Sequence, residues 1–204
     1  MESNLKITSR IHRAAFELFA EKGEMQVSIS ELAQAAGIAR GTVYNHVPSP
    51  EELFETVAGR MAEEMHKRIV ASFADVTDPA QRLANGIRYF MRRAHEEPQW
   101  GRFLIRFAFS HDALNGIWTG PTMHDVVDGL GQHRYDFRPD QMNSAIALIA
   151  GAVLASIFPV LDGQRTWREA GSDTAELVLR GLGVDAAAAR SYATAELQPL
   201  PDCP

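Results

Sequence analysis

The sequence predicts an all-α fold in two parts that share one long helix. Apolar residues recur three or four positions apart through most of the chain, which is the spacing of one helix face. Helix-start signals precede several of these stretches, among them Ser28 with Glu31 and Asp78 before Pro79. No stretch shows the clear alternation of apolar and polar residues that a half-buried strand needs, and no internal repeat occurs.

Three short helices are expected near the N-terminus. The first covers about 7–22 and ends at Gly23. The second begins after Ser28, whose side chain can form a capping box, and ends at Gly37, because glycine adopts the left-handed conformation at little cost. The third covers about 40–46 and presents polar side chains outward. Glycine in the turn and a polar outer face on the third helix are the pattern of a helix-turn-helix.

A fourth helix is expected from about Pro50, since proline is favoured at the first helical position. It is long enough to leave the small N-terminal part and enter the larger one. Apolar residues spaced by four form its stripe: Leu53, Val57, Met61, Met65, Ile69 and Phe73.

The remaining helices follow from similar signals. Asp78 and Pro79 start a helix that ends by Pro98, and another covers about 99–110. The glycine-rich segment 116–131 contains a helical piece near 123–130.

A strong helix is expected from 138 to about Phe158, bounded by Pro159. Its middle is apolar almost all round, so it must be covered on all sides. The last helix is expected at 173–182, and the tail from Val184 is either a weak helix or a cover on the body.

Composition is that of an ordinary globular protein, with 46% hydrophobic and 23% charged residues among 204. We expect a cytoplasmic protein, because the sequence shows neither an apolar run of membrane-spanning length nor a secretory signal. A single cysteine, Cys203, excludes a disulfide framework and a multi-cysteine metal site. The histidines lack metal-ligand spacing, and nucleotide-binding and hydrolase motifs are absent, so we expect no metal, no cofactor and no enzyme.

The net charge of −6 is unevenly distributed along the chain. Residues 1–48 balance their charges, and residues 49–204 carry the whole excess of acidic groups. An acidic body repels DNA except at a docking face, which favours orientation over affinity.

The segment AGIARGTVYNHVPSPEEL resembles the signature of TetR-type (tetracycline-repressor-like) transcriptional regulators, and the resemblance extends over about 7–54. Three positions depart from the family pattern. Ala39 replaces a capping serine or threonine, Val47 replaces an aromatic residue, and Pro50 replaces a lysine. The resemblance implies a DNA-binding domain at 1–48 and a domain for ligand binding and dimerisation at 49–204.

Double-stranded DNA is the expected partner of the third helix. Arginine can bind guanine, and asparagine adenine, through two hydrogen bonds, while threonine and tyrosine hydroxyls suit phosphates. Glycine lets the helix approach the groove closely. The expected DNA-binding residues are Arg40, Gly41, Thr42, Tyr44, Asn45 and His46, with Ser28 and Lys6 in second rank. Ser28 is equally well explained as a cap alone, and the polar face as a solvated surface.

The resemblance also implies a homodimer whose last two long helices form a four-helix bundle with those of a second subunit. The interface residues expected on these helices are Met142, Ile146, Ile149, Val153, Ile157, Leu177, Val178 and Leu182. Alternatively, the helix at 146–157 is the core of a monomer.

A pocket for a small-molecule effector is expected in the body. Aromatic residues and methionine suit apolar or aromatic ligands, and the expected lining is Phe90, Met91, Trp100, Phe103, Phe107, Phe109, Trp118 and Met123. Alternatively, each of these residues is part of the hydrophobic core and lines no pocket. One of the arginines of this region, Arg82 among them, is a candidate partner for an acidic ligand.

Together these features predict a homodimeric repressor that a small apolar or aromatic ligand releases from a palindromic operator. The alternative is a ligand-binding or protein-interaction module with vestigial DNA binding, which Ala39, Pro50 and the neutral N-terminal part favour.

Overall fold

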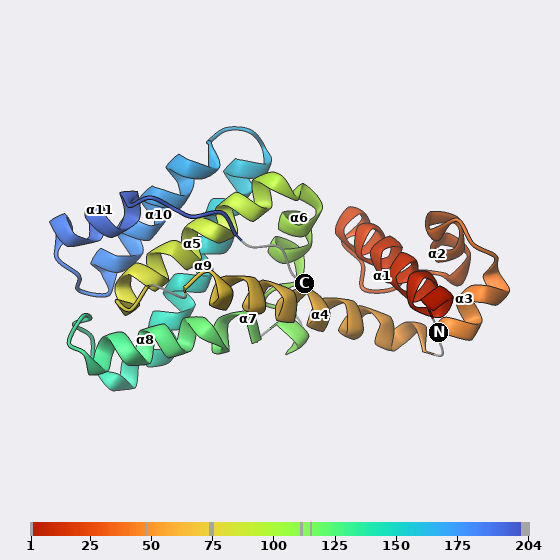
Figure 1. The fold of residues 1–204 in the computed structure, drawn as a ribbon, viewed down its shortest axis with the longest axis horizontal. Coiled ribbons are helices and arrows are strands. Elements are labelled where there is room, and N and C mark those ends of the chain that lie inside the picture. The colour runs from red at the N-terminus through yellow and green to blue at the C-terminus, as the bar shows by residue number, and fades with distance from the viewer. Residues whose placement is uncertain (1, 48, 74–75, 111, 115, 201–204) are drawn as a thin grey trace.

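The computed structural model describes residues 2–47, 49–73, 76–110, 112–114 and 116–200, and this part of the chain contains helices and no strands. A small head (α1 to α3) and a larger body (α5 to α11) are joined by the long helix α4 (Figure 1). The α-helices are α1 (Glu2–Lys22), α2 (Ile29–Ala36), α3 (Arg40–His46), α4 (Pro50–Ala71), α5 (Pro79–Glu96), α6 (Pro98–Phe107), α7 (Gly116–Thr119), α8 (Pro121–Gly131), α9 (Met142–Leu161), α10 (Trp167–Gly181) and α11 (Ala186–Thr194). The predicted all-α class is confirmed.

The head folds as its capping signals predict. Ser28 Oγ accepts a hydrogen bond from the Glu31 N–H at 3.2 Å, and the Ser28 N–H donates to the Glu31 carboxylate at 3.0 Å. Gly37 ends α2 in the left-handed conformation, with φ of 63°. Arg10 of α1 donates to the carbonyl of Ala36 at 2.7 Å, which ties α1 to the end of α2. The predicted boundary after residue 48 falls at Pro48, outside the described residues.

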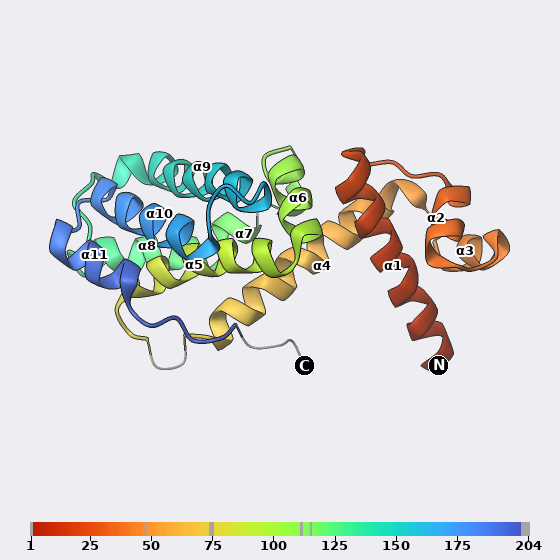
Figure 2. The same ribbon diagram turned by 90° about the horizontal axis from the view of Figure 1, so that it is seen from above.

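Helix α4 runs from the head into the body, as Figures 1 and 2 show. Its apolar stripe is buried over its whole length, from Leu53 in the head to Ile69 in the body. Phe73, the last residue of the predicted stripe, lies just beyond the helix and is half-buried. One helix therefore contributes to the apolar packing of both head and body, which form one continuous hydrophobic core.

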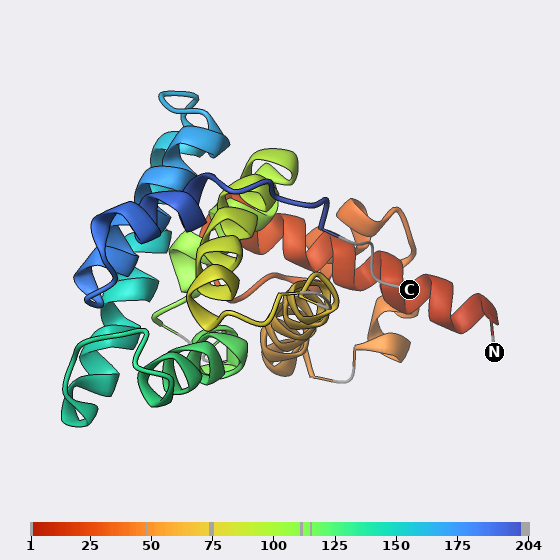
Figure 3. The same cartoon turned by 60° about the vertical axis from the view of Figure 1, so that its left-hand side comes forward.

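Helix α5 lies in the middle of the body. It packs against α10 and α11 on one side and against α8 on the other, and it also contacts α6 and α9 (Figure 3). Helix α9 lies along one edge of the body (Figure 2). It is long and apolar enough to cross a membrane by length and composition, but its regularly spaced buried residues pack on α5, α6 and α10.

The end of α9 and the start of α10 differ from the sequence-based expectation. Helix α9 continues through Pro159 to Leu161, and the chain then turns back, with the Gln164 N–H donating to the Pro159 carbonyl at 2.9 Å. Helix α10 begins at Trp167 rather than near 173, after a capping box that Thr166 forms with Glu169. The sequence pattern T-x-x-E was the signal for this start.

The tail beyond Val184 is partly helical and covers the body. Asp185 caps α11 by accepting hydrogen bonds from two backbone N–H groups. The helix packs on α10 and α5, and Leu200 is buried beyond it. The tail therefore contains a short helix and also covers the body, so the two alternatives that the sequence left open are both correct.

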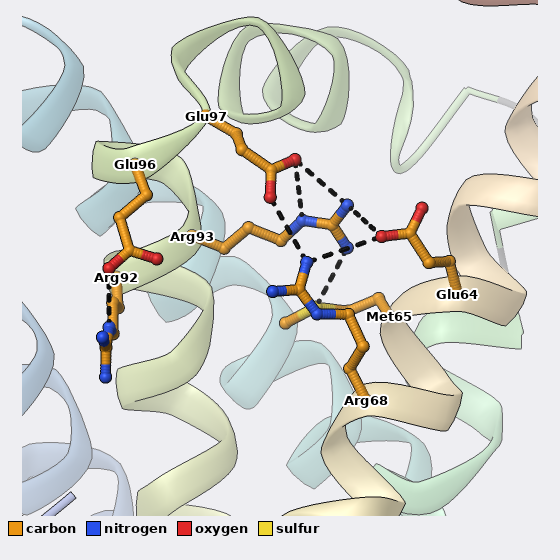
Figure 4. Close-up of polar contacts among 7 residues, drawn as sticks. All are labelled: Glu64, Met65, Arg68, Arg92, Arg93, Glu96 and Glu97. Carbon is orange, nitrogen blue, oxygen red and sulfur yellow. Dashed lines mark hydrogen bonds and ion pairs between the residues drawn. The ribbon is translucent and has the colours of Figure 1, made fainter. Parts of the chain in front are cut away.

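A charged cluster joins α4 to the corner between α5 and α6 (Figure 4). Arg93 is only 4% exposed, and it donates to Glu64 of α4 at 2.8 Å and to Glu97 at 3.2 Å. Its guanidinium lies 4.8 Å from the centre of the Trp100 ring. Arg68 of α4 contacts the same two carboxylates, at 3.5 and 3.3 Å.

Aromatic rings join the head to α6 of the body. Phe54 of α4 lies 5.5 Å from Phe103 and 4.9 Å from Phe107, measured between ring centres. Phe16 of α1 lies 5.2 Å from Phe103. Arg106 of α6 donates to the backbone carbonyls at the end of α1, including that of Glu21 at 2.8 Å. Head and body are thus in direct contact through α6 as well as through α4.

We expect Arg93→Met to lower the free energy of unfolding by about 2 kcal/mol, because it leaves two carboxylates with Arg68 as their shared cationic partner. Urea unfolding followed by circular dichroism measures this loss. Arg92→Met is the matched control, since Arg92 also pairs with a glutamate four residues on, at 2.8 Å, but its side chain is 23% exposed and contacts a single carboxylate. An equal loss in both variants would contradict a special role for the cluster.

Candidate DNA-binding surface and effector cavity

The recognition helix α3 divides into a buried and an exposed face. Val43 is fully buried, and Val47 at the end of the helix is nearly so. On the other face Arg40 and Asn45 are exposed, and Tyr44 is 63% exposed. The buried face packs α3 onto the head, and the exposed Tyr44 ring on the other face is available for contact with a partner.

The remaining predicted residues of α3 have different surroundings. Gly41 is exposed, and a Cβ atom added there would meet nothing within 4 Å. Thr42 is half-buried. The ring nitrogens of His46 are both engaged, Nδ1 with the Thr42 carbonyl at 2.8 Å and Nε2 with Asn4 Oδ1 at 2.9 Å. His46 therefore links α3 to the first turn of α1. Sequence reasoning missed Asn4, because no local signal relates two residues so far apart in the chain.

The two second-rank residues lie on the surface of the head. Ser28 is exposed, but its hydroxyl is occupied by the capping box with Glu31. Hydrogen bonds from Lys22 and from Ser28 hold the pKa of Glu31 at about 2, so this carboxylate stays charged and keeps Lys22 as its partner. Lys6 is exposed on α1.

At the start of α3, Ala39 makes no side-chain hydrogen bond, because its methyl group has neither a donor nor an acceptor. The departure from the family pattern thus leaves the first N–H groups of α3 without a side-chain cap. Val47 replaces the aromatic residue of the family pattern, and its side chain is buried in the core of the head.

The body contains a cavity of about 30 Å³ between α4, α5, α7, α8 and α9. This volume holds about one or two water molecules. Its walls are mainly apolar and include Met65, Ile69, Leu83, Ile87, Phe90 and Trp118. Ala62 and His66 of α4 border both this cavity and an outer groove, so they lie between the cavity and the surface.

A charged pair lies in the wall of this cavity. Asp125 of α8 is 6% exposed, and it accepts a hydrogen bond from Arg82 of α5 at 2.5 Å. Burial raises the pKa of Asp125, and the Arg82 guanidinium opposes that rise. Arg82 also donates to Asp128 at 3.0 Å, outside the cavity lining. The sequence analysis named Arg82 only as one of several arginines that could bind an acidic ligand. No sequence pattern indicated Asp125.

Of the predicted lining residues, Phe90 and Trp118 border the cavity, and their rings stack with centres 5.5 Å apart. The others lie outside its lining. Met91 and Trp100 are buried elsewhere in the core, Phe103 and Phe107 lie in the aromatic contact between head and body, Met123 is half-buried on α8, and Phe109 is 70% exposed. Helical spacing marks apolar residues but does not indicate which face of α5 or α6 borders a cavity.

Most of the predicted interface residues face the interior of their own chain. Ile146, Ile149, Val153, Ile157, Val178 and Leu182 are buried, and Met142 is half-buried. Leu177 is 65% exposed on α10. On the outer face of α9, Leu148 is 46% and Phe158 56% exposed. The exposed apolar residues of α9 therefore lie on the opposite face of the helix from the residues predicted to form an interface.

Comparison with known proteins identifies both parts of the chain. Residues 78–195 match the family model described as the tetracyclin repressor-like C-terminal domain. Residues 11–57 match the model of bacterial regulatory proteins of the tetR family.

Individual proteins agree with these matches. An uncharacterized HTH-type transcriptional regulator of Mycobacterium tuberculosis, Rv1255c, is 33% identical over 89 residues, which are 44% of each chain. The match thus spans less than half of that relative. The structure of RolR with the ligand resorcinol superimposes with a TM-score of 0.73 and 28% identity, covering 98% of this chain and 99% of that one. A TetR-family regulator from Shewanella sp. PV-4 shares the fold at 21% identity, with a TM-score of 0.75 over 88% of this chain and 99% of that one.

The helix-turn-helix head, the helical body and the two family matches lead to one conclusion: this chain belongs to the TetR family of DNA-binding transcriptional regulators.

Proposed function

We propose that this protein is a homodimeric repressor that binds a palindromic operator and leaves it when a small apolar or aromatic effector enters the body. It acts in the cytoplasm, where the operator DNA lies. The observation that carries this proposal is helix α4, which borders the effector cavity with Met65 and Ile69 and packs in the head with Leu53 and Phe54.

The outer face of α3 reads the operator. Arg40 and Asn45 are exposed and of the types that bind base edges through two hydrogen bonds. Tyr44 and Thr42 bind phosphates through their hydroxyls, and exposed Gly41 lets the backbone come close to the groove. Ser28 and Lys6 add phosphate contacts at the margin. His46 serves mainly to fix α3 to α1, because its ring nitrogens are engaged within the head.

The dimer interface is the outer face of α9 and α10. Leu148, Phe158 and Leu177 form its apolar part, and exposed Ala155 with half-exposed Gly151 lets a second helix approach closely. Such an apolar surface on a regulator marks an interaction site. A twofold interface of this kind places two heads one turn of DNA apart, about 34–36 Å, and matches a palindromic site.

Effector binding acts through the wall that α4 provides. An aromatic ring needs roughly 150 Å³ of cavity, and the cavity provides about 30 Å³. The walls must therefore move outward, and α4 carries this movement toward the aromatic contact between Phe54 and Phe103. The complex of RolR with resorcinol supports a body of this fold as a ligand-binding domain. The effect of the effector is limited to its differential affinity for the two arrangements.

The test is fluorescence anisotropy of the purified protein on labelled fragments of its own upstream DNA, at about 50 and 200 mM salt. We expect saturable binding of two subunits to one fragment, surviving competitor DNA and weakening with salt. Effector binding without binding to these fragments or to any sequence selected from random DNA would support the alternative of a ligand-binding module instead.

Replacing Arg40 by alanine should weaken operator binding about tenfold or more, because a base contact through two hydrogen bonds provides about 1–3 kcal/mol of discrimination. Arg190→Ala is the control, since it removes an exposed arginine of the same charge from α11, far from the head in Figure 1. Anisotropy titrations measure both affinities. Unchanged affinity of Arg40→Ala would remove this residue from the proposed contact.

Introducing a charge at the proposed interface should separate the subunits. We expect Leu177→Asp to shift the protein from dimer to monomer in light scattering after size-exclusion chromatography, because an unpaired carboxylate is costly to bury. Val127→Asp is the matched control, as Val127 is also an exposed apolar residue, but on α8. A dimer that persists in Leu177→Asp and dissociates in Val127→Asp would place the interface on α8.

A further inference from the structure

We propose that the effector is an uncharged aromatic compound of one ring bearing hydroxyl groups, held by a hydrogen bond from the Trp118 indole and a hydrogen bond to the Asp125 carboxylate. This inference rests on the proposed role of the cavity as the effector site and adds the chemistry that the site selects. The polar atoms of the cavity wall carry it.

The first of these atoms is an unused donor. Trp118 is 5% exposed, and its Nε1 is buried without a hydrogen-bond partner. A buried N–H without an acceptor is costly, and most such groups in native proteins are paired. Trp118 borders the cavity and stacks on Phe90, so a ring bound there can offer its oxygen to this N–H.

The second atom is an unused acceptor. Asp125 receives its hydrogen bond from Arg82 at Oδ1, and its other oxygen, Oδ2, accepts none from the residues that the structure describes. The residue also borders the cavity. A hydroxyl group both donates and accepts, so hydroxyl groups on a ring match an unused donor and an unused acceptor in one apolar site.

The charge balance of the wall disfavours acids. Arg82 already contacts two carboxylates, Asp125 at 2.5 Å and Asp128 at 3.0 Å. A carboxylate ligand would bring a further negative charge beside Asp125 in a mainly apolar site, where it would remain largely unpaired. The earlier expectation of an arginine that binds an acidic ligand is therefore not supported for Arg82.

The experiment compares four single-ring probes by isothermal titration calorimetry: phenol, which donates and accepts; anisole, which only accepts; toluene, which does neither; and benzoate, which is charged. The wild-type protein should bind phenol more tightly than anisole, and it should not bind benzoate measurably.

Two substitutions change one polar group each. Trp118→Phe keeps an aromatic ring but lacks the N–H, and Asp125→Asn keeps the shape but replaces one carboxylate oxygen by an NH2 group, which donates and does not accept. Each should weaken phenol about tenfold relative to toluene, since hydrogen bonds to buried or charged groups have this magnitude. Asp128→Asn is the matched control, because it removes the other partner of Arg82 from outside the cavity lining and should leave the ratio unchanged.

The outcomes separate this inference from the proposed function. Two results would contradict recognition by Trp118 and Asp125 but leave the cavity as an effector site. In the first, toluene and phenol bind and neither substitution changes the ratio of their affinities. In the second, benzoate binds as tightly as phenol. If no probe binds, the inference of a single-ring hydroxylated effector is wrong, while the proposed function is still decided separately by operator binding. The comparison among probes on the wild-type protein gives an answer even if a variant does not fold.

Discussion

The structure depends on one apolar stripe that is buried along its whole length and joins the core of the head to the core of the body. The stripe of α4 packs in the head near Leu53 and in the body near Ile69. Neither the head nor the body can repack against α4 without moving the same helix, because tightly packed interiors transmit displacement. One helix therefore connects the cavity of the body to the head that presents Tyr44 and Asn45.

The polar contacts around α4 set how it can move. Arg93 and Arg68 hold the middle of the helix to the body through Glu64 and Glu97. The aromatic contact of Phe54 with Phe103 holds its head end to α6. Glu64 and Arg68 lie in the same stretch of α4 as the residues that border the cavity, which runs from Ala62 to Ile69. The ion pairs therefore hold the cavity wall itself to the body, and under the proposed function an effector that displaces this wall would have to work against them.

The sequence was most informative where structure depends on neighbouring residues. The capping box of Ser28, the turn at Gly37 and the limits of α3 follow from local rules, and the stripe of α4 follows from helical spacing. Contacts between distant residues carried no such signal. The pairs Asn4 with His46 and Arg82 with Asp125 exist only in the fold. On α9, residues such as Ile149 and Phe158 are equally apolar, so spacing could not indicate which face turns inward.

The contact between Asn4 and His46 has a practical consequence for preparing the protein. Asn4, in the first turn of α1, places its Oδ1 2.9 Å from His46 Nε2 at the end of α3. A purification tag fused directly ahead of α1 would occupy the space beside the recognition helix and would compete with DNA there. Material for binding studies is better tagged behind the body, or freed of its tag before the operator is added.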